Sequence, residues 1–76
     1  MSTNKDIRYG MLDAELSPGE LRRRVEERAG MEISPQYFSK TLAGDYHSTK
    51  AERILREARK ILEEINRRER AERRGL

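Results

Sequence analysis

The sequence predicts an all-α fold of four helices, the last of them long, and four observations support this. Apolar and polar residues nowhere alternate as they do in a half-buried strand. Ser17 and Ser34 each stand directly before a proline, as the N-caps of helices often do. The segments that these serines open are closed by Gly30 and Gly44. Neither glycine nor proline occurs from residue 49 to about residue 70, where apolar residues recur at helical spacing.

The chain has 76 residues, of which 34% are hydrophobic and 41% are charged. It is expected to form one domain with a small core, which partner binding or dimerisation would stabilise. It contains no cysteine, so disulfides and thiolate chemistry are excluded and a reducing, cytoplasmic setting is expected. The polar start, MSTNKDIRYG, is unlike a secretory signal, and no apolar run is long enough to span a bilayer.

Positive charge gathers at the C-terminal end of a chain whose net charge is +3. Five arginines and two glutamates lie from residue 66 onward, whereas residues 1–65 carry 12 basic and 12 acidic side chains. The sequence therefore predicts a folded domain, residues 1–65, and a charged C-terminal extension, residues 66–76, that is frayed or disordered. Two roles for the extension stay open: contact with phosphates or an acidic protein, and solubility alone.

The first helix is expected from about Asn4 to Ala14, with Ile7, Met11 and Leu12 on its buried face. Gly10 interrupts this helix and weakens it by up to about 1 kcal/mol relative to alanine.

The second helix is expected to begin after Ser17, which forms a capping box with Glu20. Leu16 and Leu21 would pack together across this start as a hydrophobic staple, and Gly30 would end the helix. The buried stripe of this helix is expected at Leu21, Val25 and Ala29.

The third helix is expected between Ser34, as its N-cap, and Gly44, as its C-terminal stop. Phe38 and Leu42 are four residues apart, so both point inward from one face. The side chains left on the other faces are Gln36, Tyr37, Ser39, Lys40 and Ala43.

The fourth helix is expected to start with a capping box formed by Thr49 and Glu52. Its apolar stripe consists of Ile54, Leu55, Ala58, Ile61, Leu62 and Ile65. The spacing 54, 58, 61 and 65 alternates four and three residues, as in a coiled-coil seam. The stripe is compatible with a homodimer through this helix, and its width favours burial within the monomer.

The third helix also has the features of a helix that reads DNA. A helix and a turn precede it, and it exposes Gln36, Ser39 and Lys40, which suits a helix-turn-helix reader of the major groove. A glutamine can bond adenine bidentately, and a lysine can reach the O6 and N7 atoms of guanine. Ser34 and the free N–H groups of the helix start could face a phosphate. The alternative is an ordinary core helix with a good cap.

The segments DIRYGMLDAELSPGELRRRV and ISPQYFSKTLAG together resemble the phage-repressor (Cro and lambda-repressor-like, XRE-type) helix-turn-helix family. Ser17, Glu20 and Leu21 match the start of the family's second helix. Ser34, Phe38, Ser39 and Gly44 match its third helix. The resemblance covers roughly residues 5 to 60. It implies a small four-helix helix-turn-helix domain that binds double-stranded DNA as a repressor-like transcriptional regulator of a phage or mobile element.

Two features depart from the family pattern. The two capping serines, Ser17 and Ser34, stand seventeen residues apart, where the family usually has about eleven. An extra segment, about EERAGM, therefore lengthens the second helix or the turn. Arg22 occupies the position after Leu21, where a small residue usually lets the third helix pack closely.

The resemblance implies contacts to DNA bases from Pro35, Gln36, Ser39 and Lys40. The residues predicted to contact the DNA backbone are Ser34, Tyr37, Tyr46, His47, Lys50 and Arg22. Lys50 lies in the first turn of a helix, where a cation is unfavourable unless an anion approaches. The arginines of the second helix contact phosphates, or they form a solvated face balanced by glutamates, as Arg23 and Glu27 would at i,i+4 spacing.

A second function class stays open beside DNA binding. A helical protein–protein interaction module could dock through the long C-terminal helix, because residues 1–65 are neutral and the apolar stripe is long. An enzyme is not expected, because the chain has no cysteine, one histidine and no phosphate-binding glycine loop. No cofactor, metal or small-molecule substrate is expected either, and His47 is interpreted as an ordinary loop residue.

Overall fold

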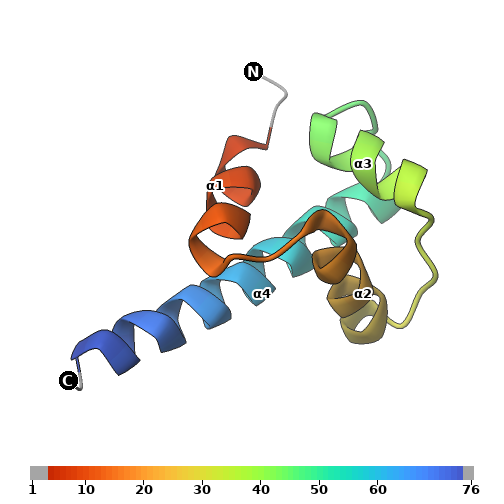
Figure 1. Cartoon of the computed structure of the whole chain (residues 1–76). Helices are drawn as coiled ribbons and strands as arrows, with labels where there is room; N and C mark the ends of the chain where they lie inside the picture. Colours follow the sequence, from red (N-terminus) through yellow and green to blue (C-terminus); the bar gives the residue numbers. More distant parts are fainter. Residues whose placement is uncertain (1–3, 75–76) are drawn as a thin grey trace.

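The computed structural model describes residues 4–74, and the side chains of residues 4–68. This part of the chain forms four helices: α1 (Lys5–Ala14), α2 (Pro18–Ala29), α3 (Pro35–Ala43) and α4 (Thr49–Arg74) (Figure 1). All regular structure between residues 4 and 74 is helical. The prediction of a small all-α domain with a helix-turn-helix unit and a long C-terminal helix is confirmed.

The charged extension predicted for residues 66–76 begins within α4, whose helix continues without a break to Arg74. Residues 75–76 and the side chains from residue 69 onward lie outside the described part of the chain. The division of the chain into residues 1–65 and 66–76 stays a prediction.

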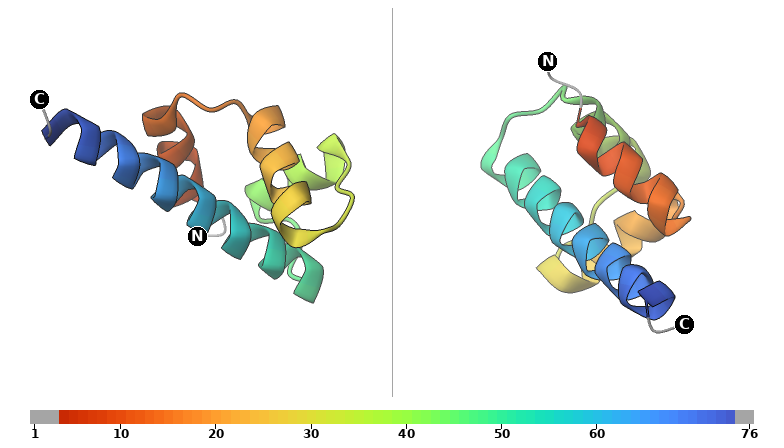
Figure 2. Two further views of the ribbon diagram at one scale, coloured as in Figure 1. Left: turned by 90° about the horizontal axis from the view of Figure 1, so that it is seen from below. Right: turned by 90° about the vertical axis from the view of Figure 1, so that its left-hand side faces the viewer.

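Helix α4 is the axis of the fold. Helices α1 and α2 both pack on it, and α3 packs on α2 and on the N-terminal end of α4 (Figure 1). The C-terminal turns of α4 project beyond the other three helices (Figure 2). The helix-turn-helix unit formed by α2 and α3 therefore sits at the opposite end of the molecule from this projection.

The core lies between α4 and the other three helices. Buried apolar side chains match the predicted stripes, and they are Ile7, Met11, Leu21, Val25, Ala29, Phe38, Leu42, Ile54, Ala58, Ile61 and Leu62. Leu55 and Ile65 are half-buried at the edges of the stripe on α4. Because Ile54, Ala58 and Ile61 are at most 6% exposed, three of the four seam positions on α4 are used within the monomer.

Three core positions differ from the prediction, and one of them, Ala51, is a buried residue of α4 outside the predicted stripe. Leu12 is 73% exposed, so its predicted burial is wrong. Helix α1 buries Ile7 and Met11, and one residue beyond Met11 the side chain has turned by about 100° around the helix axis. Ile33, in the turn between α2 and α3, is 2% exposed, and it adds a core side chain that helical periodicity does not predict.

Local chemistry sets the ends of α2 and α3 as predicted. The Ser17 hydroxyl accepts the backbone N–H of Glu20 at 3.2 Å, and the Glu20 carboxylate accepts the N–H of Ser17, which completes the capping box. The Ser34 hydroxyl accepts the backbone N–H three residues later at 3.1 Å. Gly30 and Gly44 adopt left-handed conformations, with φ of 66° and 89°, at the two C-caps.

The start of α4 lies one residue away from the predicted cap. The Ser48 hydroxyl accepts the N–H of Ala51 at 3.1 Å, and the Ser48 carbonyl accepts the N–H of Glu52 at 2.9 Å. The predicted capping box of Thr49 and Glu52 is therefore wrong. Thr49 is the first helical residue, and the cap is the residue before it, whose side chain can reach the N–H three positions on.

Gly10 marks a close approach of α1 to α4. A Cβ atom at this position would lie 3.0 Å from Cδ1 and 3.3 Å from Cβ of Leu62, so any larger residue requires a shift of the Leu62 side chain. The Nδ2 of Asn66 donates to the carbonyl of Gly10 at 3.4 Å. The glycine that weakens α1 as an isolated helix thus allows it to pack closely on α4.

Replacing Gly10 by valine is expected to lower the free energy of unfolding by about 1–3 kcal/mol, because the added methyl groups overpack the contact with Leu62. Gly19→Ala is the matched control. No atom lies within 4 Å of the Cβ that it adds to α2, so it should stabilise the protein by up to about 1 kcal/mol. Urea unfolding followed by circular dichroism measures both changes. A Gly10→Val protein as stable as the wild type would contradict the close approach.

The ion pair between Asp6 and Arg59, 2.6 Å long, predicts a contribution to stability that acid removes. The hydrogen bond from Arg59 lowers the pKa of Asp6 below its ordinary value of 3.8. A carboxyl group whose pKa is lowered by folding contributes stability that is complete above the unfolded pKa and is lost as pH falls through the folded pKa.

Asp6→Asn is therefore expected to lower the Tm at neutral pH and to reduce the further fall of Tm below about pH 4. Thermal unfolding monitored between pH 2 and pH 7 measures this dependence. Asp13→Asn changes an exposed carboxylate of the same helix and serves as the control. The same acid dependence in both variants would show that the Asp6–Arg59 pair contributes nothing.

Candidate nucleic-acid interface

Helix α3 turns its polar side to solvent. Phe38, Thr41 and Leu42 are buried against the other helices, and the Thr41 hydroxyl donates to a backbone carbonyl of its own helix at 2.8 Å. The four residues predicted to contact bases all lie on the exposed side: Pro35, Gln36, Ser39 and Lys40. Helix α4 leaves Gln36 and Lys40 uncovered, so both side chains are accessible to a ligand that approaches α3.

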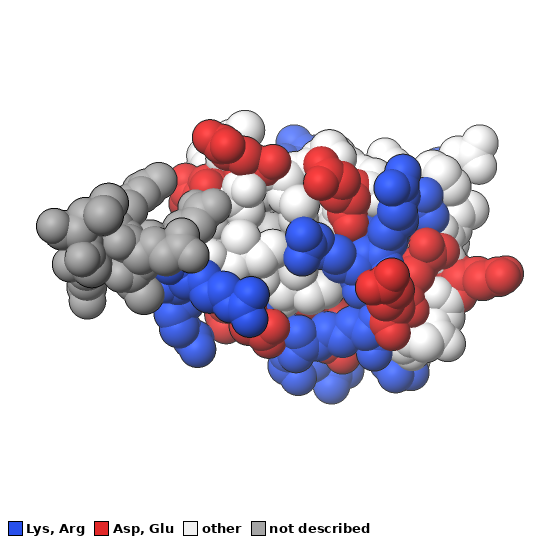
Figure 3. Space-filling model, turned by 60° about the horizontal axis from the view of Figure 1, so that its bottom comes forward, with Lys and Arg blue, Asp and Glu red and all other residues white. Residues whose placement is uncertain are grey.

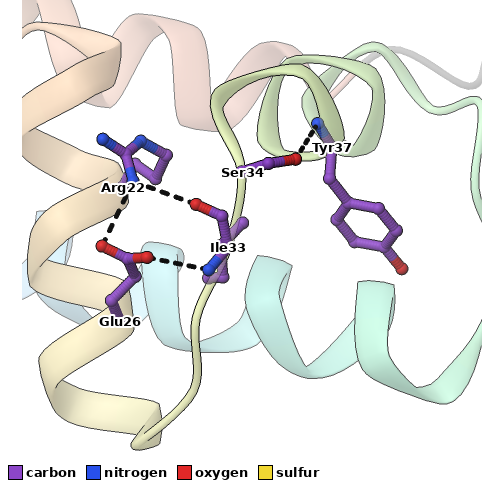
Figure 4. A network of polar contacts seen from close by, with 5 residues as sticks. All are labelled: Arg22, Glu26, Ile33, Ser34 and Tyr37. Carbon is purple, nitrogen blue, oxygen red and sulfur yellow. Dashed lines mark hydrogen bonds and ion pairs between the residues drawn. The ribbon is translucent and has the colours of Figure 1, made fainter.

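Three hydrogen bonds hold the turn that leads into α3 (Figure 4). The Nη1 of Arg22 donates to the carbonyl of Ile33 at 2.9 Å and to the Glu26 carboxylate at 3.2 Å. The other carboxylate oxygen of Glu26 accepts the N–H of Ile33 at 2.8 Å. Both backbone polar groups of Ile33 are thus bonded to α2, while its side chain lies in the core. Arg22, Glu26 and Ile33 are named the turn clamp below.

The turn clamp gives Arg22 a structural role within the domain. Residues 30–34 form the turn between α2, which has 12 residues, and α3. By the sequence resemblance, a small residue is usual at position 22. Arg22 instead reaches this turn and donates to the carbonyl of Ile33. The Arg22 side chain is 20% exposed, and the sequence did not indicate this intramolecular role. Its predicted contact with the DNA backbone stays a prediction.

Aromatic and basic side chains gather beside the start of α3. The rings of Tyr37 and Tyr46 stack with their centroids 4.8 Å apart and an interplanar angle of 23°. The Nζ of Lys50 lies 4.9 Å from the centroid of the Tyr37 ring, and the Tyr37 hydroxyl is 3.3 Å from that of Ser48. The aromatic face offsets part of the cost of placing Lys50 in the first turn of α4.

The fold thus brings three of the predicted backbone-contact residues together from α3, the following loop and α4. The remaining two outside α2 are exposed: Ser34 at the start of α3, and His47 in the loop before α4. Five of the six predicted backbone-contact residues therefore lie at the start of α3, in the loop that follows α3, or in the first turn of α4.

A second polar network holds the C-terminal end of α3. The Nδ2 of Asn4 donates to the carbonyls of Leu42 at 3.2 Å and Thr41 at 3.4 Å. The Oδ1 of Asn4 accepts from the Nη2 of Arg59 at 2.9 Å, and the same guanidinium pairs with Asp6. Asn4, at the start of α1, therefore joins the last turn of α3 to Arg59 of α4.

Sequence reasoning missed Asn4, Glu26 and Arg59 as residues that hold α3. Arg22 and Glu26 stand at i,i+4 spacing, which signals an ion pair on one helix, but their bonds to the turn have no local signal. Asparagine at a helix start signals a cap on its own helix only. Arg59 lies 55 residues from Asn4, so no sequence pattern joins them.

Basic and acidic side chains are interspersed on the face of the molecule that Figure 3 shows. Between α2 and α4, Arg28 forms ion pairs with Glu57 at 3.1 Å and with Glu64 at 2.9 Å. Helix α3, in contrast, carries one cation, Lys40, and no carboxylate. Its exposed side therefore presents a positive charge and neutral polar groups to a ligand.

Within the described residues, no group of three His, Cys, Asp or Glu side chains could hold a metal ion. No helix in the same part of the chain is long and apolar enough to cross a membrane. Comparison of the chain with protein-family models, with curated proteins and with solved structures found no match. Inference of a function therefore rests on the geometry of α3 and the groups around it, together with the sequence pattern.

Glu26→Ala is expected to lower the free energy of unfolding by about 1–3 kcal/mol, because it leaves the N–H of Ile33 without an acceptor and removes one of the two acceptors of the Arg22 Nη1. Hydrogen exchange of the Ile33 amide should accelerate more than exchange in α4. Glu27→Ala removes an exposed carboxylate from the same helix and should change stability by less than about 0.5 kcal/mol. Equal exchange of Ile33 in the two variants would rule out the turn clamp.

Proposed function

We propose that this protein is a sequence-specific, double-stranded DNA-binding transcriptional regulator that reads the major groove with α3. The observation that carries the proposal is the exposed polar side of a short helix that is anchored at both ends. The major groove, about 12 Å wide, admits one α-helix. An anchored helix presents its side chains to the base edges in one register.

The exposed side chains of α3 have the chemistry that base recognition needs. The Gln36 amide offers a donor and an acceptor, which together match the N6 and N7 atoms of adenine. The Lys40 ammonium can donate to the O6 and N7 atoms of guanine. Pro35 and Ser39 lie on the same exposed side, where they add apolar contact and a hydroxyl near the bases.

Residues around α3 would supply contacts to the DNA backbone. Ser34 and the first N–H groups of α3 form a helix N-terminus, which favours a phosphate. Tyr37, Tyr46 and Lys50 form one cluster beside it, and His47 is exposed in the same loop. Phosphate contacts of this kind fix the register of a protein on the duplex but do not read its sequence.

These features correspond to the class of small helix-turn-helix regulators, and the sequence resemblance narrows the proposal to the phage-repressor type. Regulators of this class commonly bind a two-fold site as dimers. A homodimer through α4 would use Leu55, Ile65 and the turns beyond, because the rest of the apolar stripe is buried in the monomer.

Selection of bound sequences from a random duplex pool tests the proposal. One preferred site should emerge, and its affinity should fall linearly with salt on a double-logarithmic scale. The double change Gln36→Ala and Lys40→Ala should lower affinity for that site by at least about tenfold, because each contact to a base is worth about 1–3 kcal/mol. The helix content should stay unchanged.

Lys60→Ala is the matched control for the loss of charge, because Lys60 is exposed on α4. It should leave the sequence preference as in the wild type. If the double variant of α3 protects the same site with the same affinity, α3 does not read DNA.

A protein-interaction module is the second candidate. A groove of about 460 Å³ between α2 and α4 exposes part of Ile65 among charged side chains of both signs. The balanced charge of residues 1–65 also favours a protein over a nucleic acid as the partner of this face. Titration with mixed-sequence duplex DNA at low salt separates the two candidates, because a DNA-binding protein should bind it without sequence preference.

A further inference from the structure

Asn4 stands at the N-cap of α1 but does not cap it. Its backbone carbonyl accepts the N–H groups of Ile7 and Arg8 at 3.1 and 3.3 Å, which places it at the start of the helix. Asparagine is among the best N-cap residues, because its side-chain oxygen can accept an N–H of the first turn. Here the side chain makes no such bond, with φ −82° and ψ 68° at this residue.

The side chain of Asn4 is instead used between helices. Its Nδ2 donates to two carbonyls of α3, Leu42 at 3.2 Å and Thr41 at 3.4 Å. Its Oδ1 accepts from Arg59 of α4 at 2.9 Å. One amide therefore joins the start of α1, the end of α3 and the middle of α4.

The last carbonyls of α3 need donors from outside the helix. The final four C=O groups of any α-helix have no intrahelical partner. In α3, the N–H groups of Gly44 and Asp45 return to the carbonyls of Thr41 and Lys40 at 3.1 and 3.0 Å. Within the described part of the chain, the donor to the carbonyl of Leu42 is Asn4.

The two ends of α3 are thus tied to different partners. The turn clamp bonds the approach to α3 to helix α2, and Asn4 bonds the end of α3 to α1 and α4. Between these ends, α3 is held by Phe38 and Leu42, whose apolar contacts have no directional preference. Hydrogen bonds are directional, so those at the two ends constrain the tilt of the helix.

We propose that Asn4 is a positioning residue that sets the tilt of α3 on the domain, and that recognition of DNA by α3 depends on it. The second half of this inference rests on the proposed function. Asn4 acts through the carbonyls of Thr41 and Leu42 and needs no contact with a base. A change in tilt moves Gln36 and Lys40 relative to the base edges, while contacts to the backbone without sequence preference depend on it less.

Asn4→Asp is the variant that separates positioning from folding. It keeps an oxygen for Arg59 and a side chain that can cap α1, but it loses the donor and brings a carboxylate against the carbonyls of Thr41 and Leu42. Helix content should stay as in the wild type. The Tm should stay within about 5 °C of the wild-type value. Residual dipolar couplings of the α3 amides, measured relative to those of α4, should change.

Affinity for the selected DNA site should fall by about tenfold, as for one lost base contact, with a smaller fall for mixed-sequence DNA. Asn66→Asp is the matched control. It adds the same charge and alters an asparagine that also donates to a carbonyl, that of Gly10, away from α3. The control should lower affinity for both DNAs alike and leave the couplings of α3 unchanged. Asn4→Ala, which introduces no charge, should shift the α3 couplings as Asn4→Asp does.

Unchanged α3 couplings in Asn4→Asp and Asn4→Ala would overturn the inference, whatever happens to DNA binding. Loss of helix content in both variants would also overturn it, because Asn4 would then be a folding residue. If the wild type selects no DNA site, the proposed function fails, and the couplings still decide whether Asn4 sets the tilt. Changed couplings with an unchanged ratio of specific to mixed-sequence affinity would refute the link to recognition alone.

Discussion

The side of α4 that faces the other helices is the constraint on which the rest of the structure depends. The residues buried there are Ala51, Ile54, Ala58, Ile61 and Leu62. Two small alanines among larger residues make this side uneven, and Gly10 lets α1 approach it at Leu62. A chain with 34% hydrophobic residues has a small supply of core side chains, and α4 carries more of the buried ones than any other helix. The other helices take their places by covering that helix.

The apolar contacts of such a small core constrain the orientation of α3 only weakly. Polar networks at the two ends of α3 constrain it further. Apolar contacts favour burial but tolerate rotation and sliding, whereas hydrogen bonds lose strength as their angles change. The turn clamp and the amide of Asn4 act at opposite ends of α3. The turn clamp bonds both backbone groups of Ile33 in the turn, and Asn4 bonds carbonyls at the end of the helix. The same bonds therefore satisfy backbone groups and fix a surface.

The surface presented by α3 differs from its surroundings in charge. Over α2 and α4, basic and acidic side chains are interspersed, and Arg28 pairs with Glu57 and Glu64, so the charges of this face partly cancel. Helix α3 has no carboxylate, and Lys50 and two tyrosines lie beside its start. Under the proposed function, a locally positive and polar surface on a nearly neutral domain favours binding that depends on base contacts more than on bulk charge.

The sequence by itself determined the features that depend on neighbours within one helical turn. The ends of α2 and α3 follow from caps at i,i+3 spacing, and the exposure of Gln36 and Lys40 follows from Phe38 and Leu42 on the opposite side. The burial predicted for Leu12 and the cap predicted for α4 were each wrong by one residue. One step along a helix turns a side chain by about 100°, so an error of one residue selects the wrong side chain. Only the tertiary structure decided the bonds of Asn4, the turn clamp and the stacking of Tyr37 on Tyr46. Apart from the i,i+4 pair of Arg22 and Glu26, these contacts join residues 7 to 55 positions apart, and they exist because tertiary packing brings their backbones together.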